Sequence, residues 1–218
     1  MLKAATLLLI AFLSPLARGT VIATEAFAYA SGTRLTGTAG GTGWSSPWLG
    51  SPLNSSDNAI GSGGLSYPGL PASGNRLTTV GGDVRSFRKI DTNAPGLGSI
   101  VDSNGNLGRD GTTIWIGFLA RLASGGNSGN GGIHLYDGLG NLATDPLGDK
   151  SAHERIFMGD RNSAGVWCLE RTTGGAPGGG NWDSTVPVDG TLHYLVYRLD
   201  FRAGTEEIRL FVDPPIGA

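Results

Sequence analysis

Residues 193–213 read HYLVYRLDFRAGTEEIRLFVD, and apolar side chains occupy every second position through most of this stretch. The alternation covers residues 193–201 and returns at residues 208–212, with charged residues between the apolar ones. A period of two buries one face of a β-strand and leaves the other face in water. Residues 203–205, Ala-Gly-Thr, supply the turn. The pattern therefore predicts a β-hairpin.

A second strong strand is expected from Thr112 to Leu122. The even-numbered positions from 114 to 122 carry apolar residues, and Trp115 and Leu119 add apolar side chains to the opposite face. Apolar residues on both faces are typical of a strand that is covered on both sides, which predicts a central strand. Trp115 and Trp167 both lie in such apolar runs, so we expect both in the core.

Shorter strand candidates are distributed along the rest of the chain. They are Thr20–Phe27, Gly64–Tyr67, Arg76–Val80, Asp83–Ile90, Gly131–Asp137, Arg155–Gly159 and Val166–Thr172. We expect Arg76–Val80 and Asp83–Ile90 to pair through a turn at residues 81–82. We expect the glycine-rich run 174–180 to be a loop. Glycine accounts for 38 of the 218 residues, and no segment shows a sustained helical period. These features predict an all-β fold of the sandwich or jelly-roll kind.

The N-terminus has the layout of a secretory signal peptide. Lys3 precedes an apolar run from Ala4 to Leu13, and small residues follow it. Cleavage after Gly19 or after Ala23 suits the preference for small side chains. We therefore expect a signal peptide at 1–19, one domain at 20–218 and a secreted or cell-surface protein. No later segment is apolar enough to span a membrane.

Charge and cysteine content narrow the function classes. The formal net charge is −2 and there is no basic stripe, so we expect no nucleic-acid partner. Cys168 is the single cysteine, so no internal disulfide can form. Its apolar neighbours predict a buried, inert thiol.

Several strings resemble exported proteins of planctomycetes and related bacteria that carry a laminin-G-like sandwich domain of the concanavalin A-like lectin and glucanase group. The strings are Glu25-Ala26-Phe27 with Tyr29 and Gly32, residues 40–44 with Trp48, and residues 65–70, 112–122, 194–201 and 210–215. The resemblance implies a jelly roll of two antiparallel sheets. Such proteins usually continue past residues 213–215 into a further strand, so we expect the closing C-terminal strand to be missing and Val21–Phe27 to form an exposed edge.

The resemblance also raises the possibility of a glycosidase. Laminarinase-type relatives of this fold use a Glu-x-Asp-x-x-Glu strand whose carboxylates enter one cleft. That string is absent here, and the glutamates are Glu25, Glu154, Glu170, Glu206 and Glu207. We therefore expect no enzyme, although carboxylates that are distant in the sequence can still converge in a fold.

One loop has side-chain oxygens at alternate positions, as calcium loops do. The residues are Asp102, Asn104, Asn106 and Asp110. Calcium takes six to eight oxygen ligands, which makes this loop a candidate metal site. The alternative is an Asx-turn, in which the carboxylate binds its own backbone.

A second acidic loop loosely resembles the metal loop of legume lectins, beside which the sugar lies. Tyr136, Asp137, Asn141 and Asp145 are the candidate ligand-binding residues there. The alternative is a hairpin loop whose Asp and Asn side chains bond their own backbone.

Aromatic residues in or near loops could stack on sugar faces or instead plug the ends of the sandwich. These residues are Trp44, Trp48, Tyr136 and Trp182. A non-catalytic extracellular module that binds a polysaccharide or a cell-surface glycan is the first functional hypothesis. A structural or adhesive sandwich without a small ligand is the second, and a polysaccharide-degrading enzyme is the third.

Overall fold

The structure is a computed structural model that describes residues 19–50, 58–70, 74–79, 84–122, 131–137, 153–160, 165–173 and 176–216. Antiparallel strands and loops make up these residues, with almost no helix. The all-β prediction is therefore confirmed. Within the described residues, no helix is long and apolar enough to cross a bilayer. Most of the expected signal peptide lies outside the described residues.

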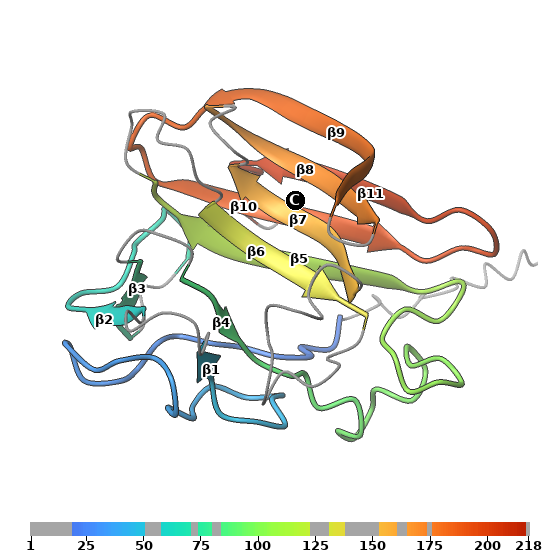
Figure 1. Cartoon of the computed structure of the whole chain (residues 1–218), viewed down its shortest axis with the longest axis horizontal. Helices are drawn as coiled ribbons and strands as arrows, with labels where there is room; N and C mark the ends of the chain where they lie inside the picture. The colour runs from blue at the N-terminus through green and yellow to red at the C-terminus, as the bar shows by residue number, and fades with distance from the viewer. Residues whose placement is uncertain are drawn as a thin grey trace, which may run out of the picture.

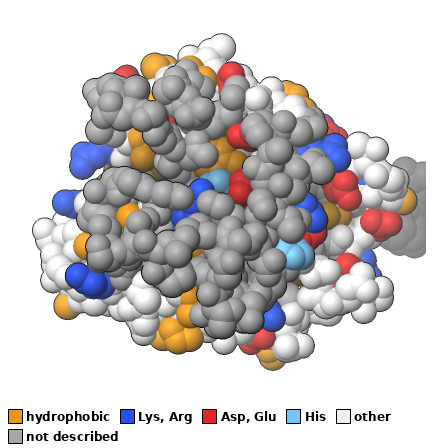
Figure 2. All heavy atoms as spheres, viewed as in Figure 1, with side chains coloured by type: hydrophobic (Ala, Val, Ile, Leu, Met, Phe, Trp, Pro, Cys, Tyr) orange, Lys and Arg blue, Asp and Glu red, His pale blue; other side chains and the backbone are white. Residues whose placement is uncertain are grey.

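Two larger sheets form the body of the molecule (Figure 1). One has the order β11-β10-β5 and the other the order β6-β7-β8-β9. Their strands are β5 (Thr113–Ala120), β6 (Gly131–Tyr136), β7 (Glu154–Asp160), β8 (Val166–Thr173), β9 (Ala176–Pro187), β10 (His193–Asp200) and β11 (Glu207–Val212). On the face shown in Figure 2, acidic and basic side chains lie interspersed.

The hydrophobic core lies between these two sheets, which makes the architecture sandwich-like. The four-stranded sheet contributes Met158, Trp167 and Leu169, and the three-stranded sheet contributes Leu195, Tyr197 and Leu199. All six are at most 4% exposed. Burial of such side chains stabilises a fold by about 1.5–3 kcal/mol each. Both sheets thus turn one apolar face toward the other.

The predicted hairpin is confirmed as β10 and β11, which pair with Tyr197 opposite Leu210. The predicted strand at 112–122 is confirmed as β5, but its expected central position is wrong. β5 pairs with β10 alone among the described strands, and β10 occupies the middle of the three-stranded sheet. The error arose because the second face of β5 is not covered by a sheet, so Trp115 is exposed and Leu119 is half-buried.

The segment before β5 contains only short strands. They are β1 (Leu49–Gly50), β2 (Ala59–Gly61), β3 (Arg76–Thr78) and β4 (Ser86–Phe87). β3 pairs with β2 and β4 with β1, so the expected pairing of β3 with β4 is wrong. The expected strand at Thr20–Phe27 does not form either, because Thr24 makes an isolated bridge to Thr42 and Phe27 adopts a φ of 50°. The expected exposed edge at Val21–Phe27 therefore does not exist.

Residues 176–180 of the glycine-rich run, which was expected to be a loop, form the start of β9, and residues 174–175 lie outside the described residues. In this strand, Gly180 lies opposite Arg171 of β8. Backbone pairing needs no side chain, so a sheet can include residues that carry no periodic signal. Trp182, expected near a loop, consequently lies within a strand.

Candidate functional site

The outer face of the three-stranded sheet carries an exposed group of aromatic side chains. Trp115 on β5 lies in register with Arg198, and Phe211 on β11 lies in register with Val196. Trp115 is 57% exposed and Phe211 is 37% exposed. The expectation that Trp115 belongs to the core is wrong. Trp167, by contrast, is 1% exposed, as expected.

The rings of Trp115 and Phe211 lean toward each other over β10. Their strands are separated by two interstrand spacings, or about 10 Å. The ring centroids are nevertheless only 6.0 Å apart, with 30° between the ring planes. Val196, which lies between them on β10, is 8% exposed although it is on the outer face. The two rings therefore form one apolar group over the middle of the sheet.

Arginine side chains surround one end of this surface. The Arg198 guanidinium lies 5.4 Å from the centre of the Trp115 ring, within the range of a cation–π interaction. Asp200 fixes it, with its Oδ1 2.9 Å from Nη2 and 3.0 Å from Nε of Arg198. A hydrogen bond from Thr113, followed by the charge and hydrogen bond of Arg198, holds the pKa of Asp200 below its usual range. Asp200 is therefore ionised at neutral pH.

A second carboxylate organises two more arginines beside Arg198. Glu207 of β11 pairs with Arg209 through Oε1 and with Arg202 through Oε2. Arg202 also lies 3.9 Å from Asp200 Oδ2. The side chains of Arg209 and Arg202 are 50% and 54% exposed. The result is one connected ion-pair network at the end of the sheet.

The aromatic surface continues along β10 in the opposite direction. The ring of Tyr194 lies over Gly117, where an added Cβ would be 2.8 Å from the tyrosine oxygen. Tyr67 packs against Tyr194 with ring centroids 5.7 Å apart. We call Trp115, Phe211, Tyr194 and Tyr67 the aromatic strip. The distance along β10 from residue 198 to residue 194 is about 13 Å, so the strip is longer than a single side chain can cover.

The sequence contains a signal for this surface in the hairpin strands. The hairpin alternation places Phe211 on the same face as Arg209, opposite to Leu210 and Val212. An aromatic residue on the polar face of an amphipathic strand marks a binding site where it joins other exposed apolar groups in one patch. What the alternation could not show is that Trp115 joins that face, because the pairing of β5 with β10 is not local.

The predicted ligand-binding loop is only partly described. Tyr136 packs edge-on against Phe87, with ring centroids 5.8 Å apart. Asp137 is 3.0 Å from His153 Nδ1 and accepts a 2.6 Å hydrogen bond from Arg155 Nε. Asn141 and Asp145 lie outside the described residues. The sugar site expected in this loop stays a prediction.

The predicted calcium loop contains an Asx-turn. Oδ1 of Asp102 accepts hydrogen bonds from the backbone N–H groups of Asn104 and Asn106, both at 2.8 Å. The backbone hydrogen bond from Asn106 is the largest cause of the lowered pKa of Asp102. Asp110 is exposed. One carboxylate oxygen thus already serves its own loop, and calcium binding at these residues stays a prediction.

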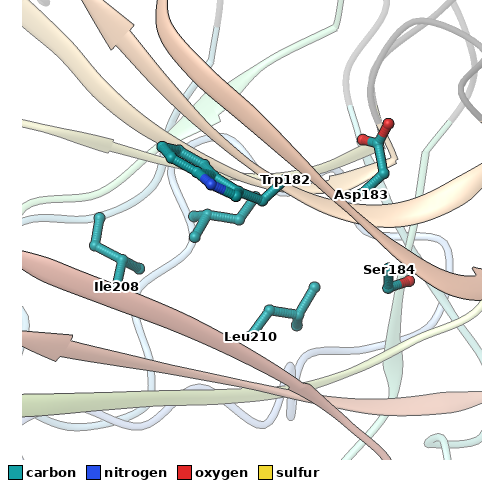
Figure 3. A pocket seen from close by; sticks show the side chains of 6 residues that line it. Trp182, Asp183, Ser184, Ile208 and Leu210 are labelled. Carbon is teal, nitrogen blue, oxygen red and sulfur yellow. The ribbon is translucent and has the colours of Figure 1, made fainter.

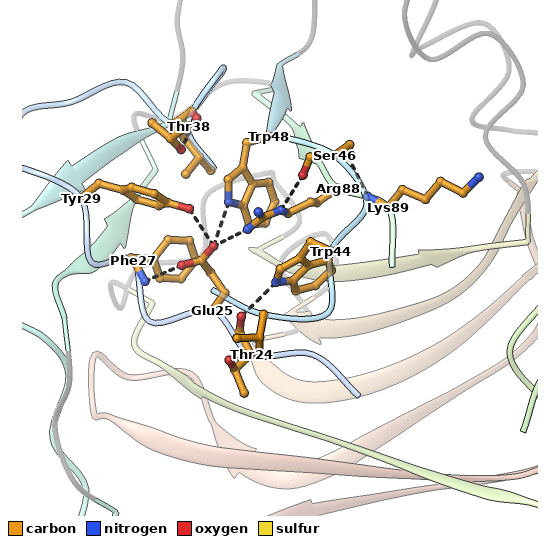
Figure 4. Close-up of polar contacts among 12 residues, drawn as sticks. Thr24, Glu25, Phe27, Tyr29, Thr38, Trp44, Ser46, Trp48, Arg88 and Lys89 are labelled. Carbon is orange, nitrogen blue, oxygen red and sulfur yellow. Dashed lines mark hydrogen bonds and ion pairs between the residues drawn. The ribbon is translucent and has the colours of Figure 1, made fainter. Parts of the chain in front are cut away.

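Trp44 and Trp48 are half-buried and pack around a buried ion pair (Figure 4). Arg88 Nη1 is 2.6 Å from Glu25 Oε2, and the two side chains are 4% and 9% exposed. The guanidinium lies 5.0 Å from the ring centre of Trp44 and 5.5 Å from that of Trp48. Tyr29 adds a 2.9 Å hydrogen bond to the same carboxylate oxygen. These aromatics hold the N-terminal segment in place.

Trp182 lies beside a small apolar pocket (Figure 3). The pocket has a volume of about 220 Å³, and its apolar lining comes from Trp182, Leu169, Ile208 and Leu210. It opens between β9 and β11, where the two sheets are not hydrogen-bonded to each other. Drug-sized ligand sites usually enclose at least about 300 Å³, so this pocket is small for a ligand site.

A third cluster lies on the outer face of the four-stranded sheet. Glu154 and Glu170 are 8% and 7% exposed, and they come from the neighbouring strands β7 and β8. His134 Nδ1 is 2.7 Å from Glu154 Oε1, and the imidazole packs against Phe157 with ring centres 4.6 Å apart. No sequence pattern groups these residues, because a bulge and strand pairing bring them together.

Among the described residues, no three His, Cys, Asp or Glu side chains are grouped closely enough to hold a metal ion. Comparison with known proteins found no matching protein-family model, no matching curated protein and no matching solved structure.

Proposed function

We propose that this chain is a non-catalytic carbohydrate-binding module and that the aromatic strip is its binding surface. The observation that carries the proposal is the exposed pair of Trp115 and Phe211, held 6.0 Å apart on a sheet face. Pyranose rings present C–H groups on their flat faces, and these pack on aromatic rings through dispersion and hydrophobic contact. Guanidinium groups at the edge can donate hydrogen bonds to the sugar hydroxyls.

The fixed geometry of the strip supports binding over a purely structural role. Gly117 leaves room for the Tyr194 ring, and Asp200 fixes Arg198 beside Trp115. A preorganised surface loses little side-chain entropy when a ligand binds. Trp115 and Phe211 are 57% and 37% exposed and adjacent, and a contiguous exposed apolar patch is the feature that marks an interaction surface.

The proposal includes the setting of the module. We infer that the sandwich is a concanavalin A-like jelly roll and that residues 1–19 direct the chain to the exterior or the cell surface. The pairing of β5 with the distant β10 supports the first inference, because jelly rolls join strands that are far apart in sequence. The charged start and apolar run of the N-terminus support the second.

Affinity gel electrophoresis against a panel of soluble polysaccharides tests the binding surface. We expect at least one polysaccharide to retard the protein, and Trp115→Ala and Phe211→Ala to abolish the retardation. Trp182→Ala is the matched control, since Trp182 is 54% exposed but belongs to the other sheet. Binding lost in Trp182→Ala and retained in Trp115→Ala would contradict the proposed surface.

The absence of catalysis is tested separately, by measuring reducing ends released from the polysaccharide that binds. We expect no release above background. Release that disappears in Glu154→Gln would contradict the non-catalytic assignment and would identify the cluster around His134 as an active site. If no polysaccharide binds and none is cleaved, the structural or adhesive hypothesis replaces the proposal.

A further inference from the structure

We infer that the ligand of the aromatic strip is an acidic glycan, whose carboxylate or sulfate groups bind the arginines beside Trp115. This inference rests on the proposed function and specifies its ligand class. Three guanidinium groups, those of Arg198, Arg202 and Arg209, face the two carboxylates of Asp200 and Glu207. The network therefore carries one uncompensated positive charge next to the sugar platform.

The carboxylates of this network have little capacity left for sugar hydroxyls, because arginine or threonine donors already bind three of their four oxygens and the fourth is buried. Asp200 Oδ1 accepts hydrogen bonds from Thr113 Oγ1 and from Arg198, while Asp200 Oδ2 is buried. Both oxygens of Glu207 are bound by arginine. A neutral sugar, which needs acceptors as well as donors around its hydroxyls, would find few acceptors here.

The arginines, by contrast, retain free donors. Arg198 and Arg209 each bind their carboxylate through Nε and Nη2, and Nη1 of each has no acceptor among the described residues. Guanidinium groups recognise carboxylate and sulfate oxygens with paired, charge-assisted hydrogen bonds. Because both arginines are already held by carboxylates, ligand binding costs little further side-chain entropy. The surface offers donors and positive charge, which an anionic sugar residue complements.

A single-stranded nucleic acid also has stacking rings and negative charges, and aromatic surfaces with arginine bind it in other proteins. The charge here favours a glycan. Nucleic-acid sites neutralise many phosphates along a basic groove, whereas this network has one excess positive charge on a chain of net charge −2. An oligonucleotide is therefore one arm of the test.

The test measures the affinity of the full chain by isothermal titration calorimetry against matched polymers. Polygalacturonate is compared with fully methyl-esterified pectin, and dextran sulfate is compared with dextran. Oligo(dT) is the nucleic-acid arm. We expect polygalacturonate or dextran sulfate to bind at least about tenfold more tightly than its uncharged counterpart, the change typical for one charge-assisted contact.

Two variants and one control separate the contribution of charge from that of the aromatic rings. Arg209→Gln should weaken acidic-polymer binding about tenfold or more. Arg155→Gln should not, because that arginine is paired with Asp137 on the other sheet and is similarly exposed, at 42%. Trp115→Ala should abolish binding to every polymer. Added salt should weaken the binding of the acidic polymers and leave the binding of the uncharged polymers unchanged.

The outcomes distinguish the inference from the proposal on which it rests. Equal binding of charged and uncharged polymers that depends on Trp115 overturns the acidic ligand and leaves the glycan platform intact. Acidic binding that is indifferent to Trp115→Ala and to Arg209→Gln overturns the inference as non-specific ion attraction. Tighter binding of oligo(dT) than of any polysaccharide overturns both. The absence of binding to all polymers overturns the proposed function itself.

Discussion

The rings of Trp115 and Phe211 meet over β10 although β5 and β11 are not neighbours in the sheet. Leaning across a whole strand lets two separate side chains form one surface and covers Val196 beneath them. The arrangement gives the outer face of the sheet a continuous apolar centre with charged groups at its edge. It also predicts that the two rings matter more for binding than for folding.

Replacement of Trp115 should cost little stability compared with replacement of a core tryptophan. We expect Trp115→Ala to lower the free energy of unfolding by about 1 kcal/mol, the value of one aromatic pair. Trp167→Ala should lower it by about 3–5 kcal/mol, because Trp167 is 1% exposed and its loss leaves a cavity. Urea denaturation followed by circular dichroism measures both. Equal losses would show that Trp115 is a structural residue.

The hydroxyl of Tyr197 should make a small, separable contribution. It donates a 2.9 Å hydrogen bond to the carbonyl of Cys168 and so joins the two sheets through the core. Burial raises the pKa of Tyr197, which keeps the hydroxyl protonated and able to donate. Tyr197→Phe keeps the ring stacked on Phe118 and should cost about 1 kcal/mol of unfolding free energy. Tyr197→Ala should cost several times more in the same urea titration.

The ion pair of Glu25 and Arg88 should stabilise the N-terminal segment. Removing one partner leaves the other charge buried, so Glu25→Gln should cost about 3 kcal/mol. Arg88→Met should have a similar effect. The double variant should cost much less than the sum of the two, since no unpaired charge remains. Hydrogen exchange of residues 19–50 measures the local effect, and additive losses would argue against coupling of the two side chains.

Two glycines with similar backbone angles should differ in their tolerance of alanine. Gly43 has a φ of 78°, and a Cβ there would lie 1.9 Å from the carbonyl oxygen of Ile22. Gly105 has a φ of 82° and open space around it. Gly105→Ala should cost about 1 kcal/mol from the backbone angle alone. Gly43→Ala should lower the melting temperature clearly further, and equal shifts would refute the close contact with Ile22.

Acid should weaken the ion-pair network beside Trp115. The pKa of Asp200 is lowered in the folded protein, chiefly by the Thr113 hydrogen bond and then by Arg198. A lowered folded pKa means that this stabilisation is fully present above the unfolded value of about 3.9, and is lost as the pH falls through the folded pKa. We therefore expect the melting temperature to drop less steeply below about pH 4 in Asp200→Asn than in the wild type. Parallel curves would contradict the role of Asp200.

Local patterns in the sequence determined much of this protein. The alternation of apolar and polar residues specified the hairpin of β10 and β11, and it placed Leu210 and Phe211 on opposite faces. Glycine content and the lack of helical periods specified the all-β class. These features are local because side-chain direction in a strand depends only on position along that strand.

Tertiary structure alone decided which faces are buried and which distant strands pair. Trp115 and Trp167 lie in similar apolar runs, yet one is exposed and the other is in the core, because the second sheet covers only one face of β5. Only the tertiary structure brings Glu25 into contact with Arg88, which is 63 residues away. Only strand pairing places the glycine-rich residues 176–180 in β9. Burial and strand pairing depend on which part of the chain lies opposite a residue, and the alternation of apolar residues along one strand does not contain that information.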